Sequence, residues 1–134
     1  MNSQMHGAVL AEIQKRWNVA ASTWDIKALS QIYSRDALFF GLLPNLYIGR
    51  AEIEKYFGSY LEVLNSVTLT LLEQNTRALG PSVFAAQGFG EIFNRRHDGS
   101  ITTGKVRSSF VIVNVDGVWE ISLHHFSEVT HRML

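Results

Sequence analysis

The sequence predicts an α+β domain in which helices cover one face of an antiparallel sheet. Apolar residues recur every three to four positions in the first third of the chain, which indicates amphipathic helices. The second half instead carries long, β-branched, partly alternating stretches that are typical of strands. Within it, residues 106–129 place Asp116-Gly117 between two such stretches, the pattern of a β-hairpin with a two-residue turn. Helices followed by a run of strands are typical of α+β folds.

Composition limits the class of protein. The chain has 134 residues, enough for one hydrophobic core, so we expect a single domain over residues 1–134. Twelve basic residues balance twelve acidic ones, which argues against nucleic-acid binding. Cysteine is absent, which excludes disulfides and thiolate nucleophiles. No apolar run approaches the ~20 residues that span a bilayer, and the first residues become charged before a signal-peptide core could form. We therefore expect a cytoplasmic protein that does not bind membranes.

Helix and strand boundaries follow from spacing, caps and breakers. The expected helices are residues 7–22, 26–32 and 50–64, and Asp25 is a good N-cap for the second. The expected strands are residues 37–40, 67–78 and 82–94, and a stretch from 101 that leads into the hairpin 106–129.

The Asp116-Gly117 turn predicts the register of the last two strands. A two-residue turn there pairs Ser108 with His125. If Asp98-Gly99 makes a second two-residue turn, Phe89 pairs with Ser108. Alternation then predicts one bulky sheet face, which we expect to line a cavity: Ala85, Gln87, Phe89, Glu91, Phe93, Ser108, Phe110, Ile112, Trp119, Ile121, Leu123, His125 and Ser127. A slip of one residue would exchange the two faces.

The opposite face is flatter and mixed. Its apolar and small residues are Ala86, Gly88, Gly90, Ile92, Val111, Val113 and Phe126. Such a surface is too apolar to leave in water comfortably, and small residues let another sheet approach closely. We therefore expect a homodimer that forms through this outer sheet face, with an interface of at least ~1,000 Å².

Two groups of residues resemble known proteins. The first half, with Trp24-Asp25, Leu29, Tyr33, Asp36-Ala37, Ile48-Gly49-Arg50, Ile53 and Tyr56-Phe57, resembles nuclear transport factor 2-like proteins. The ending, Asp116-Gly117-x-Trp119-x-Ile121 and His125-x-Ser127, is similar to SnoaL-like proteins and to the association domain of calcium/calmodulin-dependent kinase II. This resemblance covers essentially the whole chain. It implies a cone, in which a strongly curved antiparallel sheet wraps around N-terminal helices and leaves a cavity at the open end.

The resemblance does not settle function, because the group includes isomerases, dehydratases, polyketide cyclases, ligand-binding proteins and assembly modules. One catalytic branch can be tested by position. The aspartate base of ketosteroid isomerases falls on Gly41, and their oxyanion-stabilising tyrosine falls on Trp17. A glycine cannot abstract a proton, so the sequence argues against such an isomerase unless another carboxylate, such as Glu91, replaces the base.

His125 is the candidate for chemistry on the expected bulky face. Its unperturbed pKa near neutrality suits a catalytic acid or base, or a ligand contact. The alternative is a core histidine that hydrogen-bonds Ser108 or a backbone carbonyl. Glu91 could join His125 in catalysis, or could lie near the exposed end of its strand and point to water. Adjacent strand residues point to opposite faces, so His124 and His125 cannot chelate one ion, and we expect no metal and no other cofactor.

The expected cavity has aromatic walls and few polar tips, which suits a small, planar or ring-containing organic molecule, neutral or weakly acidic. The expected ligand-binding residues are Trp17, Tyr56, Tyr60, Gln87, Phe89, Ser108, Phe110, His125 and Ser127, although ordinary packing is an alternative for the tyrosines. We predict a homodimeric small-molecule-binding protein. Two alternatives stay open: a cofactor-free enzyme of the lyase, cyclase or isomerase type that uses His125 as acid or base, and an assembly module.

Overall fold

The computed structural model describes residues 2–129 and shows an α+β fold. Its elements are α1 (Ser3–Ala21), α2 (Ile26–Ser30), β1 (Tyr33–Phe40), β2 (Tyr47–Ile48), α3 (Gly49–Gly58), β3 (Leu64–Gly80), β4 (Val83–Arg96), β5 (Ile101–Val115) and β6 (Val118–Glu128). The six strands form one sheet in the order β2-β1-β6-β5-β4-β3. Neighbouring strands are antiparallel except for β1 and β6, which are parallel.

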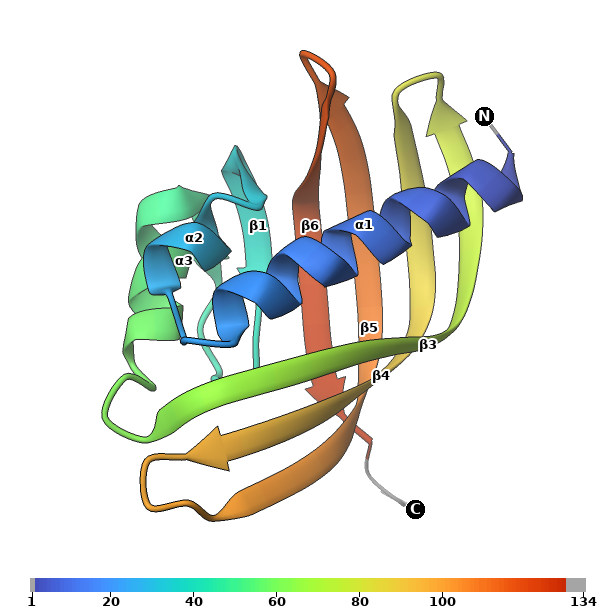
Figure 1. Cartoon of the computed structure of the whole chain (residues 1–134). Helices are drawn as coiled ribbons and strands as arrows, with labels where there is room; N and C mark the ends of the chain where they lie inside the picture. Colours follow the sequence, from blue (N-terminus) through green and yellow to red (C-terminus); the bar gives the residue numbers. More distant parts are fainter. Residues whose placement is uncertain (1, 130–134) are drawn as a thin grey trace.

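The sheet is strongly curved and wraps around the helices. Helix α1 lies diagonally across one face of the sheet, and α2 and α3 lie beside β1 (Figure 1). The long strands β3, β4 and β5 bend below α1 at the lower end of the view in Figure 1. We call the face that the helices cover the inner face and the opposite one the outer face. This arrangement confirms the predicted fold class.

Helix α1 is fixed to the free edge of the sheet. Strand β3 is the last strand of the sheet, so its outward backbone groups lack a strand partner. Asn18 supplies one instead, because its side-chain oxygen accepts from the N–H of Leu69 and its nitrogen donates to the carbonyl of Leu69, both at 2.8 Å. One turn earlier, Gln14 Oε1 accepts from the N–H of Leu71 at 2.7 Å. The helix thus covers an edge that could otherwise pair with another chain.

Helix ends follow their caps. The Asp25 carboxylate accepts from the N–H of Ala28 at 3.0 Å, which confirms the predicted N-cap. Helix α1 begins at Ser3, earlier than predicted, because the side chain of Asn2 caps it by accepting from the N–H of Met5. Helix α3 ends at Gly58 rather than at residue 64, and the following turns lead directly into β3.

Among residues 2–129, no helix combines the length and apolar character needed to cross a membrane.

The hairpin between β5 and β6 has the predicted turn but not the predicted register. Asp116 and Gly117 both have positive φ angles, 51° and 87°, as a two-residue turn of type I′ requires. Further along, Ile112 pairs with Ile121 but Val111 pairs with Leu123, so Ser122 forms a bulge. Beyond this bulge every residue of β6 is shifted by one. The predicted pairing of Ser108 with His125 is therefore wrong.

The turn between β4 and β5 is longer than predicted. The N–H of Arg96 donates to the carbonyl of Ser100, which leaves the three residues 97–99 in the loop. Gly99 lies in the left-handed region at φ 86°, as three-residue hairpin loops require. Phe89 consequently pairs with Arg107 rather than with Ser108.

These two shifts change the composition of the faces. The inner face carries Phe84, Ala86, Gly88, Gly90, Ile92, Val106, Ser108, Phe110, Ile112, Trp119, Ile121, His124 and Phe126. The outer face carries Ala85, Gln87, Phe89, Glu91, Phe93, Arg107, Ser109, Val111, Val113, Leu123, His125 and Ser127. Five residues expected at a dimer interface, Ala86, Gly88, Gly90, Ile92 and Phe126, therefore lie on the face that the helices cover, and that part of the prediction is wrong.

Candidate functional site

A cavity of about 220 Å³ lies between the helices and the inner face of the sheet. Aromatic and aliphatic side chains make most of its wall. The lining residues are Trp17, Trp24, Phe39, Leu42, Tyr56, Phe57, Tyr60, Val63, Leu64, Val67, Ile92, Asn94, Arg96, Val106, His124, Phe126 and Glu128. Arg96 and Glu128 are exposed at strand ends, so they mark the mouth of the cavity.

The aromatic wall is held by edge-to-face contacts. The rings of Trp17, Trp24 and Phe57 meet one another at interplanar angles of 70–81° and centroid distances of 5.7–6.5 Å. Trp24 Nε1 donates to the carbonyl of Phe57 at 3.0 Å, which ties the α1–α2 connection to α3. The wall on this side is therefore rigid and apolar.

A buried pair, Tyr33 and His124, forms the polar part of the site. The Tyr33 hydroxyl and His124 Nδ1 are 2.7 Å apart, and the two rings are nearly parallel, with an interplanar angle of 5°. Arg50 holds the main chain of Tyr33, because its Nε donates to the Tyr33 carbonyl at 2.7 Å while its guanidinium pairs with Glu120 at 3.1 Å.

Both members of this pair are held neutral by burial. His124 is only 2% exposed and contacts the rings of Phe39, Phe110 and Phe126. This desolvation, with a smaller contribution from the adjacent His125, lowers the pKa of His124 well below its usual value. Burial likewise raises the pKa of the Tyr33 hydroxyl far above its ordinary value.

Two polar atoms of the wall are left without a partner. Within residues 2–129, Trp17 Nε1 and His124 Nε2 are buried and make no hydrogen bond. Both side chains line the cavity. A buried donor or acceptor without a partner destabilises a protein by about 1–3 kcal/mol, so such atoms are usually satisfied by a ligand or by water. The cavity can therefore hydrogen-bond a molecule at its depth.

Tyr56 shapes the cavity near β1. Its hydroxyl accepts from the N–H of Leu42 at 2.9 Å, and burial raises its pKa far above the ordinary value. A Cβ added at Gly41 would collide with the Tyr56 ring. A carboxylate base of the ketosteroid isomerase type could not stand at position 41 unless this ring moved.

The structure divides the predicted ligand-binding residues between two places. Trp17, Tyr56 and Tyr60 line the interior cavity. Ser108 and Phe110 occupy inward-facing positions of β5. Ser108 accepts from Gln74 Nε2 at 3.0 Å and also borders the outer depression described below, while Phe110 packs against the ring of His124. The remaining predicted residues lie on the outer face: Gln87, Phe89, His125 and Ser127. Their expected placement inside the cavity is wrong.

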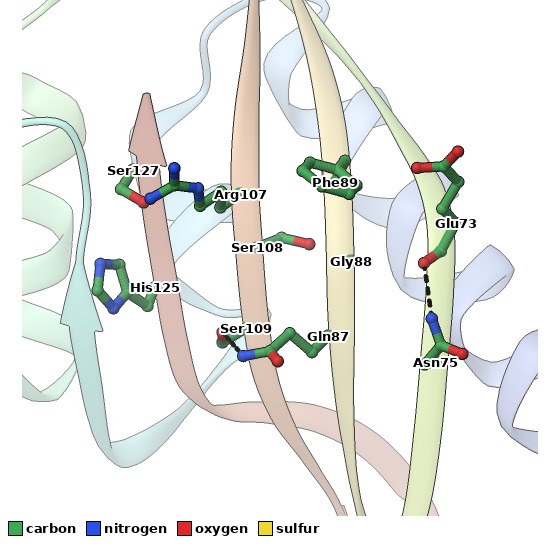
Figure 2. A pocket seen from close by; sticks show the side chains of 10 residues that line it. All are labelled: Glu73, Asn75, Gln87, Gly88, Phe89, Arg107, Ser108, Ser109, His125 and Ser127. Carbon is green, nitrogen blue, oxygen red and sulfur yellow. Dashed lines mark hydrogen bonds between the residues drawn. The ribbon is translucent and has the colours of Figure 1, made fainter. Parts of the chain in front are cut away.

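The outer-face residues line a shallow, open depression (Figure 2). Gln87 Nε2 donates there to Ser109 Oγ at 2.8 Å, and the exposed His125 ring contacts Phe40 with a centroid distance of 5.4 Å. Glu91 is not part of this depression. It lies four positions along β4 from Gln87, which shares the row of His125, so it is about 13 Å away along the strand direction alone. The structure does not bring Glu91 and His125 together.

His124 is the site residue that the sequence analysis missed. The adjacent histidines indicated that one of the two points inward, and only the register decided which. The bulge at Ser122 that inverts the choice has no sequence signal of its own.

Among residues 2–129, no group of three or more His, Cys, Asp or Glu side chains is arranged to hold a metal ion.

A curved, mostly antiparallel sheet around helices, with a cavity on its inner face, defines an α+β cone fold. Residues 10–131 match the SnoaL-like domain, and the chain belongs to this family. This assignment confirms the resemblance found in the sequence. A search of curated proteins found no match.

Solved structures share the fold at low sequence identity. A proposed calcium/calmodulin-dependent protein kinase II association domain from Xanthomonas campestris is 22% identical, with a TM-score of 0.80 over 90% of this chain and 85% of that one. A proposed dehydratase of the NTF2-like family from Streptomyces avermitilis is 12% identical, with a TM-score of 0.78 over 97% and 100% of the two chains. A ketosteroid isomerase-like protein from Erwinia carotovora atroseptica is 16% identical, with a TM-score of 0.74 over 98% and 100%. At these identities the likeness establishes the fold alone.

Proposed function

We propose that this protein binds a small, ring-containing organic molecule in its interior cavity. The observation that carries the proposal is the pair of buried, unpartnered polar atoms, Trp17 Nε1 and His124 Nε2, in an otherwise aromatic wall. Aromatic walls offer flat apolar contact to a ring, and a few placed polar atoms fix its orientation.

The size of the cavity limits the ligand. An apolar cavity of about 150 Å³ can hold benzene. At about 220 Å³, this cavity suits one substituted ring or a small bicyclic compound. A larger ligand would have to extend through the mouth, past Arg96 and Glu128.

A thermal-shift screen of monocyclic and bicyclic compounds tests the proposal. At 100 times its dissociation constant, a ligand stabilises the native state by about 2.7 kcal/mol, which raises the melting temperature of a domain of this size by roughly 5–10 °C. Val106→Phe, on the cavity wall, should abolish the shift because the larger side chain fills the space. Val115→Phe makes the same change at the exposed tip of β5 and should keep the shift. The proposal fails if no ring compound shifts the melting temperature, or if Val106→Phe keeps the full shift.

Catalysis is the second candidate, and one observation favours it. Tyr33 orients His124, and His124 lines the cavity, which is how a neutral imidazole that stabilises a developing oxyanion is positioned. A cofactor-free reaction in this cavity would therefore use His124, not His125. Binding is nevertheless the better-supported function, because burial keeps both Tyr33 and His124 neutral and so opposes proton transfer through them.

We also propose that two chains associate through the outer sheet face. Val111, Val113, Leu123 and Phe93 lie on this face, and Phe93 is 38% exposed. Sedimentation at micromolar concentration should show a dimer, and the double variant Val111→Glu, Val113→Glu should be monomeric because it introduces four charges at a twofold interface. Native protein that sediments only as a monomer would contradict this association. A dimer whose cavity binds no ligand would favour the assembly-module alternative.

A further inference from the structure

We propose that His124 presents a fixed Nε2–H donor to the cavity, so that the site selects a neutral molecule with a carbonyl-type acceptor. This inference rests on the proposed function, and it names the class of ligand that the same cavity takes. It follows from the hydrogen bonds available to each form of the Tyr33–His124 pair.

The doubly protonated form of His124 is excluded by its surroundings. Tyr33 from β1 contacts the ring, and burial keeps its hydroxyl neutral. Tyr56, whose hydroxyl burial also keeps neutral, lines the same cavity, as do Arg96 and Glu128, which are exposed at its mouth. Burial, with a smaller contribution from the neighbouring His125, holds the pKa of His124 well below its usual value. No carboxylate is hydrogen-bonded to the ring within residues 2–129. A charged imidazolium there would be buried and uncompensated.

The form with the proton on Nδ1 leaves a buried hydroxyl proton unused. In that form Nδ1–H would donate to the Tyr33 oxygen, and the Tyr33 proton would need another acceptor. The contact with His124 is the one hydrogen bond that the Tyr33 hydroxyl makes in the part of the chain that the structure describes. A buried O–H without an acceptor is costly, so this form is disfavoured.

The form with the proton on Nε2 satisfies the pair. Tyr33 O–H donates to Nδ1, and the remaining Nε2–H belongs to a ring that lines the cavity and has no partner within residues 2–129. The other unpartnered atom of the site, Trp17 Nε1, belongs to an indole. An indole nitrogen can only donate. Both unpartnered atoms of the site are therefore donors.

Two donors in an uncharged wall define the complementary ligand. A carbonyl oxygen can accept the hydrogen bond that Nε2–H offers. A carboxylate would also accept, but its charge would be buried away from Arg96, the basic lining residue, which is exposed at the mouth. An unpaired buried carboxylate is strongly disfavoured. Ketones, aldehydes, esters and lactones on a ring fit the site, and the corresponding acids do not.

The first test reads the proton position directly. Long-range ¹H–¹⁵N correlation spectra of the histidine side chains distinguish the two neutral tautomers and the cation. We expect native His124 to remain the Nε2–H tautomer from pH 5.5 to 8, and Tyr33→Phe to show a mixture because the donor to Nδ1 is gone. A native His124 with its proton on Nδ1, or one that titrates in this range, would overturn the inference.

The second test compares three probes of similar shape: acetophenone, 2-phenylpropene, which replaces the carbonyl oxygen by a CH₂ group, and benzoate. One neutral hydrogen bond corresponds to about a 3- to 10-fold difference in affinity, so acetophenone should bind that much more tightly than 2-phenylpropene, and benzoate more weakly still. His124→Phe should reduce the acetophenone preference to about 1-fold, whereas His125→Phe, the same change on the outer face, should keep it.

The outcomes separate the two proposals. Equal binding of acetophenone and 2-phenylpropene keeps the cavity as a ring-binding site and overturns the selection for an acceptor. A preference that survives in His124→Phe but disappears in Trp17→Phe assigns the donor to the indole and overturns the role of His124. Failure of all three probes to bind contradicts both the proposed function and the ligand class, while the tautomer spectrum still decides whether His124 is a fixed donor. If His124→Phe does not fold, the native affinity ratio and the native spectrum decide the question.

Discussion

The buried hydrogen bond between Tyr33 and His124 predicts strong energetic coupling between two residues 91 positions apart in the chain. Tyr33→Phe leaves His124 Nδ1 without its donor, and His124→Phe leaves the Tyr33 hydroxyl without its acceptor. Both groups are almost fully buried, with exposed fractions of 0% and 2%, so water cannot compensate. Each single variant should therefore lose about 1–3 kcal/mol of stability.

The double variant Tyr33→Phe, His124→Phe should lose less than the sum of the two. It removes both polar groups and keeps two rings in the aromatic cluster, so neither partner is left unsatisfied. The coupling energy should be about 1–2 kcal/mol. Urea unfolding at pH 7.5 measures all three differences, and a loss of 1–3 kcal/mol should also lower the melting temperature by roughly 3–10 °C.

Tyr60→Phe is the matched control, because Tyr60 also lines the cavity but is only half-buried. It should change stability by no more than about 0.5 kcal/mol. Strictly additive losses in the double variant would refute the reasoning, since they would mean that the two groups do not interact in the native state.

Two further predictions concern pH and the sheet edge. Because burial holds the pKa of His124 well below the unfolded value of about 6.5, the unfolded state binds a proton that the folded state does not as pH falls below 6.5. The free energy of unfolding should therefore decrease toward pH 5, by up to about 1.4 kcal/mol per pH unit from this group. Urea unfolding of His124→Phe should lack this contribution of His124, and equal pH slopes in the native protein and the variant would contradict the prediction. Asn18→Ala removes both hydrogen bonds to Leu69 and should lower the free energy of unfolding by about 1–3 kcal/mol. Gln14→Ala removes one hydrogen bond to the same edge and should lower it by about half as much. Equal losses of stability in urea unfolding would contradict this role of the two side chains at the β3 edge.

The sequence by itself determined the types of element and the class of fold. Helical spacing around Trp17, the N-cap Asp25 and the Asp116-Gly117 turn are local signals, because each depends on residues within one or two turns of chain. The structure has all three where they were predicted. The family resemblance rested on short motifs of the same kind, and the match over residues 10–131 agrees with it.

The tertiary structure alone decided which side chains enter the cavity. Side chains alternate between the faces of a strand, so one extra residue at Ser122 exchanges His125 for His124, and one extra residue in the loop 97–99 turns Gln87 and Phe89 outward. Asp98-Gly99 is compatible with a two-residue and with a three-residue loop, and Ser122 carries no signal for a bulge, so the local pattern did not choose between the registers. The partner that orients His124 is Tyr33, which comes from β1, and only the parallel pairing of β1 with β6 brings the two together. The chemistry of the site therefore depends on contacts between strands that no spacing in the sequence specifies.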